Sequence, residues 1–221
     1  AFPDTFPEYA EAIVTGNPVR AQITPLPFHT RQGGGRQQQL RLLILGGSQG
    51  AAAINQLVPQ LISGWCGPVP LQVWHQCGER HLPDCTDQYA SQGVTLDSDH
   101  RLEAFIDDMA EAYHWADIVL CRSGASTVFE LAAAGLPSIL IPYPYHSDRQ
   151  QERNARWLAN DGAAKLVLQD KLNFETIDKL LVQYATERSA LVEMGERALA
   201  KATPDAADTI ARHCLEVVHG H

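Results

Sequence analysis

The chain has 221 residues, of which 45% are hydrophobic and 19% are charged, proportions typical of a globular protein that buries a sizeable core. The formal net charge of −9, with no basic stripe along the sequence, argues against a nucleic-acid-binding surface and against adhesion to anionic lipid by charge alone. No apolar run approaches the length of a membrane span, and five cysteines without CxxC spacing favour reduced thiols in a reducing cytoplasm.

Residues 1–39 are predicted to form a linker segment and a loop. The chain starts at Ala1, without an initiator methionine and in loop-like sequence, so we expect a fragment whose N-terminal part is missing. Residues 12–20 are compatible with a short strand followed by a turn at 17–18. Residues 25–39 are rich in Pro, Gly and Gln, which predicts a mobile loop.

Regular alternation of strands and helices begins at Leu40. Short apolar runs bounded by turn residues predict strands at 40–45, 70–75, 93–96, 117–121, 137–142 and 164–168. Helical patterns are predicted at 50–64, 79–92, 108–115, 126–134, 148–160, 173–186, 188–202 and 205–218. This alternation predicts a doubly wound, Rossmann-like α/β fold with a parallel sheet covered on both faces. The last three helices lack intervening strands and are candidates for packing across a partner domain.

The most informative stretch is the turn between the strand at 117–121 and the helix that follows it. The strand is apolar and ends at a Ser-Gly pair, after which residues 125–127 open the helix. A helix start directly after a buried strand presents unpaired N–H groups and the positive end of a dipole, which suits a phosphate. Glu130, about one turn into the helix, can accept hydrogen bonds from two neighbouring hydroxyls, as in a ribose. Helix capping explains the hydroxyls at 126–127 but not Glu130, so we favour the functional interpretation.

A second polar helix start, at 148–154, supplies donors and acceptors suited to a sugar. Phosphate, ribose and sugar together indicate a nucleotide-sugar site. The glycine turn at 46–50 follows the first strand, where glycines let a ligand approach the backbone and Ser48 can donate to a phosphate oxygen. Taken alone, this turn is equally consistent with a tight βα connection, because it lacks the Walker Lys-Ser/Thr and the Rossmann G-x-G-x-x-G pattern.

The segment 105–109 precedes a short helix and admits two interpretations. Backbone groups of Ile106 can pair with a flat base edge, or Asp107 or Asp108 can cap the helix. On this segment alone, the capping interpretation is favoured.

A metal site is not predicted. His75, Cys77, His81 and Cys85 have suggestive spacings, but they are divided between a strand end and the next helix. Zinc fingers pair their ligands more tightly than this.

Several motifs, in this order, resemble the C-terminal half of the MurG family of bacterial N-acetylglucosaminyltransferases. The matching stretches are TGNPVR (15–20), LGGSQGA (45–51), VWHQCG (73–78), FIDDMAEAYHWADIVLCRSGASTVFE (105–130), AAAGLPSILIPYP (132–144), DRQQERNA (148–155) and GAAK (162–165). They cover nearly the whole chain, and motifs in fixed order are far more specific than one glycine turn. The resemblance implies the donor-binding domain of a two-domain GT-B enzyme at 40–221, behind an interdomain linker at 1–39 and without the N-terminal acceptor domain.

The resemblance also implies a reaction, in which GlcNAc passes from UDP-GlcNAc to undecaprenyl-diphosphate-linked MurNAc-pentapeptide (lipid I) and yields lipid II for peptidoglycan. The family works peripherally on the cytoplasmic side of the bacterial inner membrane, without a cofactor or a metal, and its catalytic base would lie in the missing domain. Carried over by motif, the backbone of Ile106 would meet the uracil, and Glu130 would hold the ribose hydroxyls. The diphosphate would be held by Ser48 and by the helix start at Ala125, Ser126 and Thr127, with Arg20 nearby. The GlcNAc hydroxyls would be bound by Gln151, with Gln150 and Asn154. The loop before Gln150 is about one residue longer than in relatives, which leaves the choice between Gln150 and Gln151 open.

Three alternatives belong to other classes. A donor-binding subunit of a split UDP-sugar glycosyltransferase, recruited by a membrane partner, would start near Leu40, and the linker-like TGNPVR segment argues against it. A UDP-GlcNAc epimerase on the same fold would need an acid/base pair near the sugar that the sequence does not display. A plain structural domain leaves the polar groups at three strand ends unexplained.

Overall fold

A computed structural model of the protein describes residues 2, 12–25, 38–47 and 51–219. The described residues form a six-stranded sheet of order β3-β2-β1-β4-β5-β6, in which every neighbouring pair is parallel. The strands are β1 (Leu40–Leu45), β2 (Leu71–Gln76), β3 (His100–Glu103), β4 (Ile118–Cys121), β5 (Ser138–Leu140) and β6 (Lys165–Leu166). The order runs outward from β1 to β3 on one side and from β4 to β6 on the other, so the β1–β4 boundary is the topological switch point.

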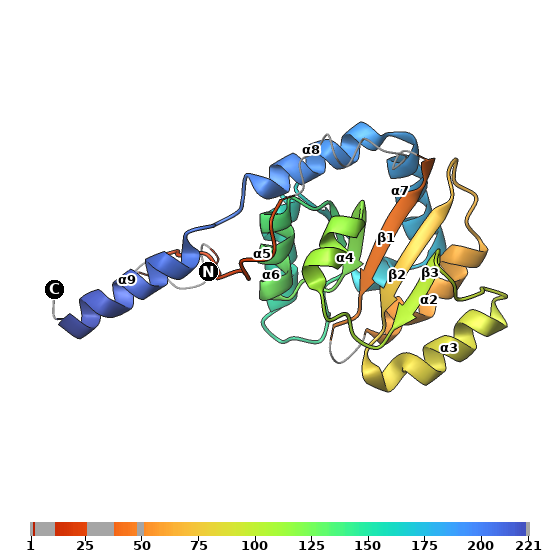
Figure 1. Ribbon diagram of the computed structural model, residues 1–221, viewed down its shortest axis with the longest axis horizontal. Helices are drawn as coiled ribbons and strands as arrows, with labels where there is room; N and C mark the ends of the chain where they lie inside the picture. The colour runs from red at the N-terminus through yellow and green to blue at the C-terminus, as the bar shows by residue number, and fades with distance from the viewer. Residues whose placement is uncertain (1, 3–11, 26–37, 48–50, 220–221) are drawn as a thin grey trace.

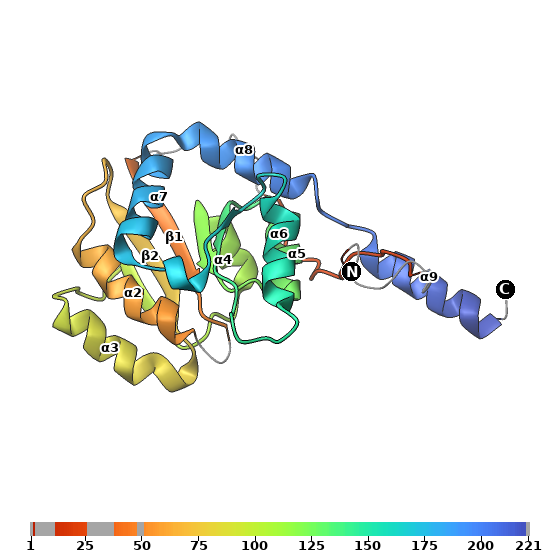
Figure 2. The same ribbon diagram turned by 180° about the vertical axis from the view of Figure 1, so that it is seen from behind.

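Helices cover both faces of the sheet (Figures 1 and 2). The helices α2 (Ala52–Ser63), α3 (Leu82–Ser91) and α7 (Phe174–Thr186) pack on one face, and α4 (Met109–Trp115), α5 (Ala125–Ala134) and α6 (Gln150–Ala159) pack on the other. Successive strand residues point to opposite faces. In β1, Leu42 and Ile44 therefore join the first core cluster, while Leu43 and Leu45 join the second. The predicted doubly wound, Rossmann-like fold is confirmed.

The last two helices of the chain do not lie flat on a face of the sheet as the other helices do. α8 (Arg188–Leu199) runs over one end of the domain and contributes to both core clusters. α9 (Ala206–His219) projects away from the sheet in both views (Figures 1 and 2), with its first turn beside the segment 12–25, and exposes Leu215, Val217 and Val218. None of the described helices combines the length and the apolar composition of a transmembrane span.

One predicted strand is wrong. Residues 93–96 are not a strand, and the strand between α3 and α4 is β3. Gly93 takes a left-handed φ of +69°, and the next N–H bonds back to the Tyr89 carbonyl, so this stretch ends α3 instead. A turn follows in which Asp97 Oδ1 accepts from the N–H of His100 at 3.0 Å. β3 escaped prediction because it is a half-buried edge strand with the polar sequence HRLE.

The remaining predicted elements recur with ends shifted by a few residues, and the helix predicted from 79 opens with a 3-10 turn, η3 (Glu79–His81). The short strand considered at 12–20 does not form, because the described residues 12–25 contain no regular element. Instead this segment packs against the α5 side of the domain, where Ile23 is buried in the second core cluster. The loop predicted at 25–39 falls almost wholly outside the described residues.

Candidate functional site

A cleft of about 790 Å³ lies at the carboxyl ends of the strands on either side of the switch point. Turns that follow three neighbouring strands line it. Gly46 and Gly47 follow β1, Arg122 and Gly124 follow β4, and Tyr143 follows β5. Crevices at this place in an open α/β sheet are where ligands bind.

The N-terminus of α5 opens into this cleft, because Gly124 and Thr127 both line it. No side chain caps the helix at Gly124, so neither Ser126 nor Thr127 has the capping role that a purely structural interpretation gives it. The N–H groups of the first turn, from Ala125 to Thr127, lack intrahelical partners and stand at the positive end of the helix dipole. This turn can accept an anion.

The glycine turn after β1 borders the same space. Ser48 lies outside the described residues, but Gly46 and Gly47 before it and Ala51 after it line the cleft. Gly47 has a left-handed φ of +76°, which favours glycine. A Cβ on Gly46 would lie 3.0 Å from the Gln76 carbonyl oxygen, so a larger residue would crowd β2. Residues of both turns thus line the same cleft.

Ser123 ties the β4–α5 turn to α6. Its Oγ donates to the Gln151 carbonyl oxygen at 2.7 Å, and its own carbonyl oxygen accepts from Asn154 Nδ2 at 3.0 Å. Ser123 and Asn154 are both buried. These bonds hold together two polar segments that the sequence analysis identified separately.

Of the three α6 residues expected near a sugar, the structure brings Gln151 to the cleft. Its Oε1 accepts from the Tyr143 N–H at 3.0 Å, which leaves the amide nitrogen available to a ligand. Gln150 and Asn154 line a separate pocket of about 600 Å³, and the Asn154 amide is already engaged by Ser123. The geometry therefore favours Gln151 over Gln150.

Glu130 lies one turn after Thr127 on the same face of α5 and keeps 15% of its side chain exposed. Its Oε1 accepts from Arg20 Nη2 at 3.0 Å and Nε at 3.2 Å. Its Oε2 accepts from the Tyr113 hydroxyl at 2.9 Å. Arg20, expected near a diphosphate, is therefore paired with the residue expected to hold a ribose.

Ile106 lies in the β3–α4 loop with its side chain buried among residues of the second core cluster, which includes Tyr113. Within the described chain, its backbone N–H and C=O make no hydrogen bond, and the residue as a whole is 2% exposed. Asp108 caps α4, accepting from the Glu111 N–H at 2.9 Å. The capping interpretation is confirmed, and it leaves the base-binding interpretation of Ile106 intact.

Sequence reasoning missed Arg122, a cation in the lining of the cleft. Its Nη1 donates to the carbonyl oxygens of Ile141 and Pro142, both at 3.1 Å, and its Nη2 donates to Gln169 Oε1 at 2.7 Å. Burial lowers the pKa of Arg122 below its usual value. The sequence signal that could have identified it is an arginine placed directly after the four apolar residues of a buried strand. Tyr113 was missed for a different reason, because an apolar helix face predicts only core packing.

Of the four residues considered for a metal, His75, Cys77 and Cys85 have structural contacts, and His81 lines the cleft. His75 lies between Asn55 Oδ1 and the Tyr89 hydroxyl, both at 3.1 Å, and burial lowers its pKa to about 3. Within the described ranges, no three His, Cys, Asp or Glu side chains are grouped to hold a metal ion. All five cysteines are free thiols.

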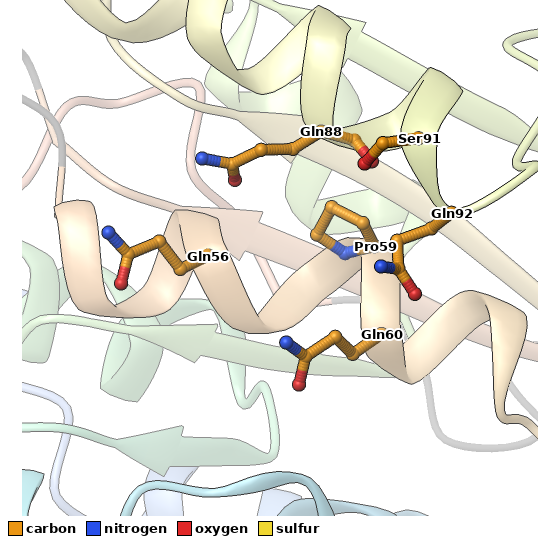
Figure 3. Close-up of a pocket in the computed structure, with 6 residues that line it drawn as sticks. All are labelled: Gln56, Pro59, Gln60, Gln88, Ser91 and Gln92. Atoms are coloured by element: carbon orange, nitrogen blue, oxygen red, sulfur yellow. The ribbon is translucent and has the colours of Figure 1, made fainter.

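A smaller hollow of about 290 Å³ lies between α2 and α3 (Figure 3). Glutamine amides, one serine and one proline line it, with no charged group and no residue shared with the cleft. It carries no chemistry that singles it out as a site.

Comparison with known proteins gives concordant findings. Residues 41–210 match the family described as glycosyltransferase family 28 C-terminal domain. The chain is 44% identical over 217 residues to the UDP-N-acetylglucosamine--N-acetylmuramyl-(pentapeptide) pyrophosphoryl-undecaprenol N-acetylglucosamine transferase of Serratia proteamaculans, which covers 98% of the chain and 58% of the relative. The Stutzerimonas stutzeri transferase of the same name is 42% identical over 220 residues, covering 100% of the chain and 60% of the relative.

The crystal structure of MurG from Acinetobacter baumannii resembles this protein over the whole length of the present chain. The TM-score is 0.77 at 32% sequence identity, and the match covers 100% of this chain and 59% of that one. The chain thus spans about three-fifths of the length of the relatives it matches.

Proposed function

Because the chain belongs to glycosyltransferase family 28, we propose that it supplies the donor site of an N-acetylglucosaminyltransferase. The whole protein would transfer GlcNAc from UDP-GlcNAc to undecaprenyl-diphosphate-linked MurNAc-pentapeptide and so form lipid II. The acceptor and the cytoplasmic face of the bacterial inner membrane would be met by the part of the relatives' length that this chain does not cover. The relatives are longer single chains, of which this chain covers 58% and 60%, and this length speaks against a split enzyme with a separate donor subunit.

The observation that carries this proposal is the convergence of two open backbone turns on one cleft, with Glu130 one turn behind. The uncapped start of α5 and the glycine turn around Ser48 would hold the diphosphate. Glu130 would hold the ribose hydroxyls, and the free backbone groups of Ile106 would meet the uracil edge. Gln151 would contact the GlcNAc, and Asn154 would support it from behind through Ser123.

The proposed mechanism is a direct displacement with inversion. A hydroxyl of the acceptor sugar attacks the anomeric carbon as the bond from that carbon to the diphosphate oxygen breaks, and UDP leaves. Negative charge grows on the departing diphosphate, where fixed N–H groups at the α5 start stabilise the transition state. Arg122, held by two carbonyl oxygens and Gln169, adds a cation on the same side of the cleft. The general base that takes the acceptor proton would come from the part of the relatives not covered here.

Isothermal titration with UDP-GlcNAc tests the proposal. The wild-type chain should bind it, and Glu130→Ala should weaken binding about tenfold or more, as expected for hydrogen bonds to a charged group. Glu152→Ala is the matched control, because Glu152 is another partly exposed carboxylate paired with an arginine, Arg156, at 2.7 Å. No binding by the wild type, or equal losses in the two variants, would contradict the proposal.

A further inference from the structure

The two carboxylate oxygens of Glu130 have partners of very different mobility. Oε2 accepts from Tyr113, whose side chain is 1% exposed within the second core cluster. Oε1 accepts from Arg20, whose side chain is 52% exposed on a segment without regular secondary structure. One partner is therefore fixed by packing, whereas the side chain of the other is half exposed.

The buried partner is suited to permanent donation. Burial, and next the nearby Glu130 carboxylate, hold the pKa of Tyr113 well above its usual value, so the phenol keeps its proton and donates it to Oε2. Because α4 packs directly on the sheet, this hydroxyl cannot follow Glu130 if the carboxylate turns. The bond thus fixes both the position and the plane of the carboxylate.

The exposed partner is suited to exchange. An ion pair with a half-exposed cation contributes little to stability, since water and salt compete for both charges. A vicinal diol donates two hydrogen bonds, and Oε1 offers the lone pairs that Arg20 now uses. Oε2 retains one further lone pair beside the one bonded to Tyr113.

We propose that Tyr113 is a positioning residue that presents Glu130 to the ribose, and that the ribose hydroxyls displace Arg20 from Oε1. This inference rests on the proposed function, because it assumes that Glu130 is the ribose ligand. Without Tyr113, the carboxylate follows Arg20 toward solvent, and the ribose meets a mobile group.

The test compares the affinities of the 221-residue chain for UDP and for 2′,3′-dideoxy-UDP, which lacks both ribose hydroxyls. The ratio of the two affinities isolates the contribution of the diol. Tyr113→Phe should lower this ratio about fivefold, as expected for one well-aligned hydrogen bond, and leave dideoxy-UDP affinity unchanged. Tyr89→Phe is the matched control, because Tyr89 is an equally buried tyrosine whose hydroxyl bonds to His75 at 3.1 Å. It should keep the wild-type ratio.

Each other outcome has a definite meaning. If Glu130→Gln abolishes the preference for UDP while Tyr113→Phe keeps it, the positioning role is refuted and the ribose site stands. If Tyr113→Phe weakens both nucleotides equally, the tyrosine is merely structural and the inference fails. If the wild type shows no preference, or Glu130→Gln retains it, the ribose assignment itself fails. Arg20→Gln should keep or raise the ratio, since a competitor for Oε1 is removed, and a lower ratio would contradict the exchange.

Discussion

The substitution Asn154→Ala tests whether Asn154 supports the fold of α6 through Ser123 or binds the sugar directly. The Asn154 amide is buried and donates to the Ser123 carbonyl oxygen at 3.0 Å. Its removal deletes one hydrogen bond and leaves that carbonyl oxygen buried without its partner, which costs about 2 kcal/mol of unfolding free energy. For a domain of this size, a loss of that magnitude lowers Tm by about 4–8 °C.

Urea denaturation measures the structural role as a change in the free energy of unfolding. Titrations of the same samples with UDP and UDP-GlcNAc measure the ligand role as a change in affinity. Asn160→Ala, at the exposed end of the same helix, is the control and should change stability by less than about 0.5 kcal/mol. We expect Asn154→Ala to lose stability and to weaken UDP-GlcNAc only as far as Gln151 loses its support. Unchanged stability together with a selective loss of UDP-GlcNAc affinity would show that Asn154 is itself a sugar ligand and would refute this reasoning.

Three further predictions concern other contacts. Gln151→Ala should weaken UDP-GlcNAc several-fold and leave UDP unchanged by calorimetry, because Gln151 lines the cleft beyond the diphosphate turns; equal effects on both ligands would contradict its role. Arg188→Ala should lower the free energy of unfolding in urea by about 3 kcal/mol, because it removes the guanidinium that lies 2.9 Å from the buried Asp117 carboxylate, whereas a change below about 1 kcal/mol would show that the pair is dispensable. The pKa of His75 is lowered to about 3, so between that pH and about 6.5 only the unfolded chain binds its proton, and stability falls as the pH falls by up to about 1.4 kcal/mol per unit. His75→Phe should flatten this acid limb in urea unfolding at several pH values, and an unchanged slope would contradict the assignment.

Local pattern sufficed for the parallel sheet, because β4 is a continuous apolar run and β1 is apolar at every position except Arg41, as expected of strands buried on both faces. It failed at β3, where an edge strand buries too little of its surface to need an apolar sequence. The position of the α5 start at the cleft was predictable, because this turn follows a strand directly. The Arg20–Glu130 pair joins residues 110 positions apart, so no local pattern contains it. The choice of Gln151 over Gln150 likewise depends on the orientation of α6, which only tertiary packing sets.

The most direct test of the donor site is an amide chemical-shift titration of the isotopically labelled chain with UDP. A nucleotide seated across the switch point should shift the amides of Gly47, Ile106 and Thr127 together, with a common dissociation constant, and leave those of Gln56 and Gln92 between α2 and α3 unchanged. Shifts gathered between α2 and α3, or separate affinities at the three cleft positions, would contradict a single uridine diphosphate site.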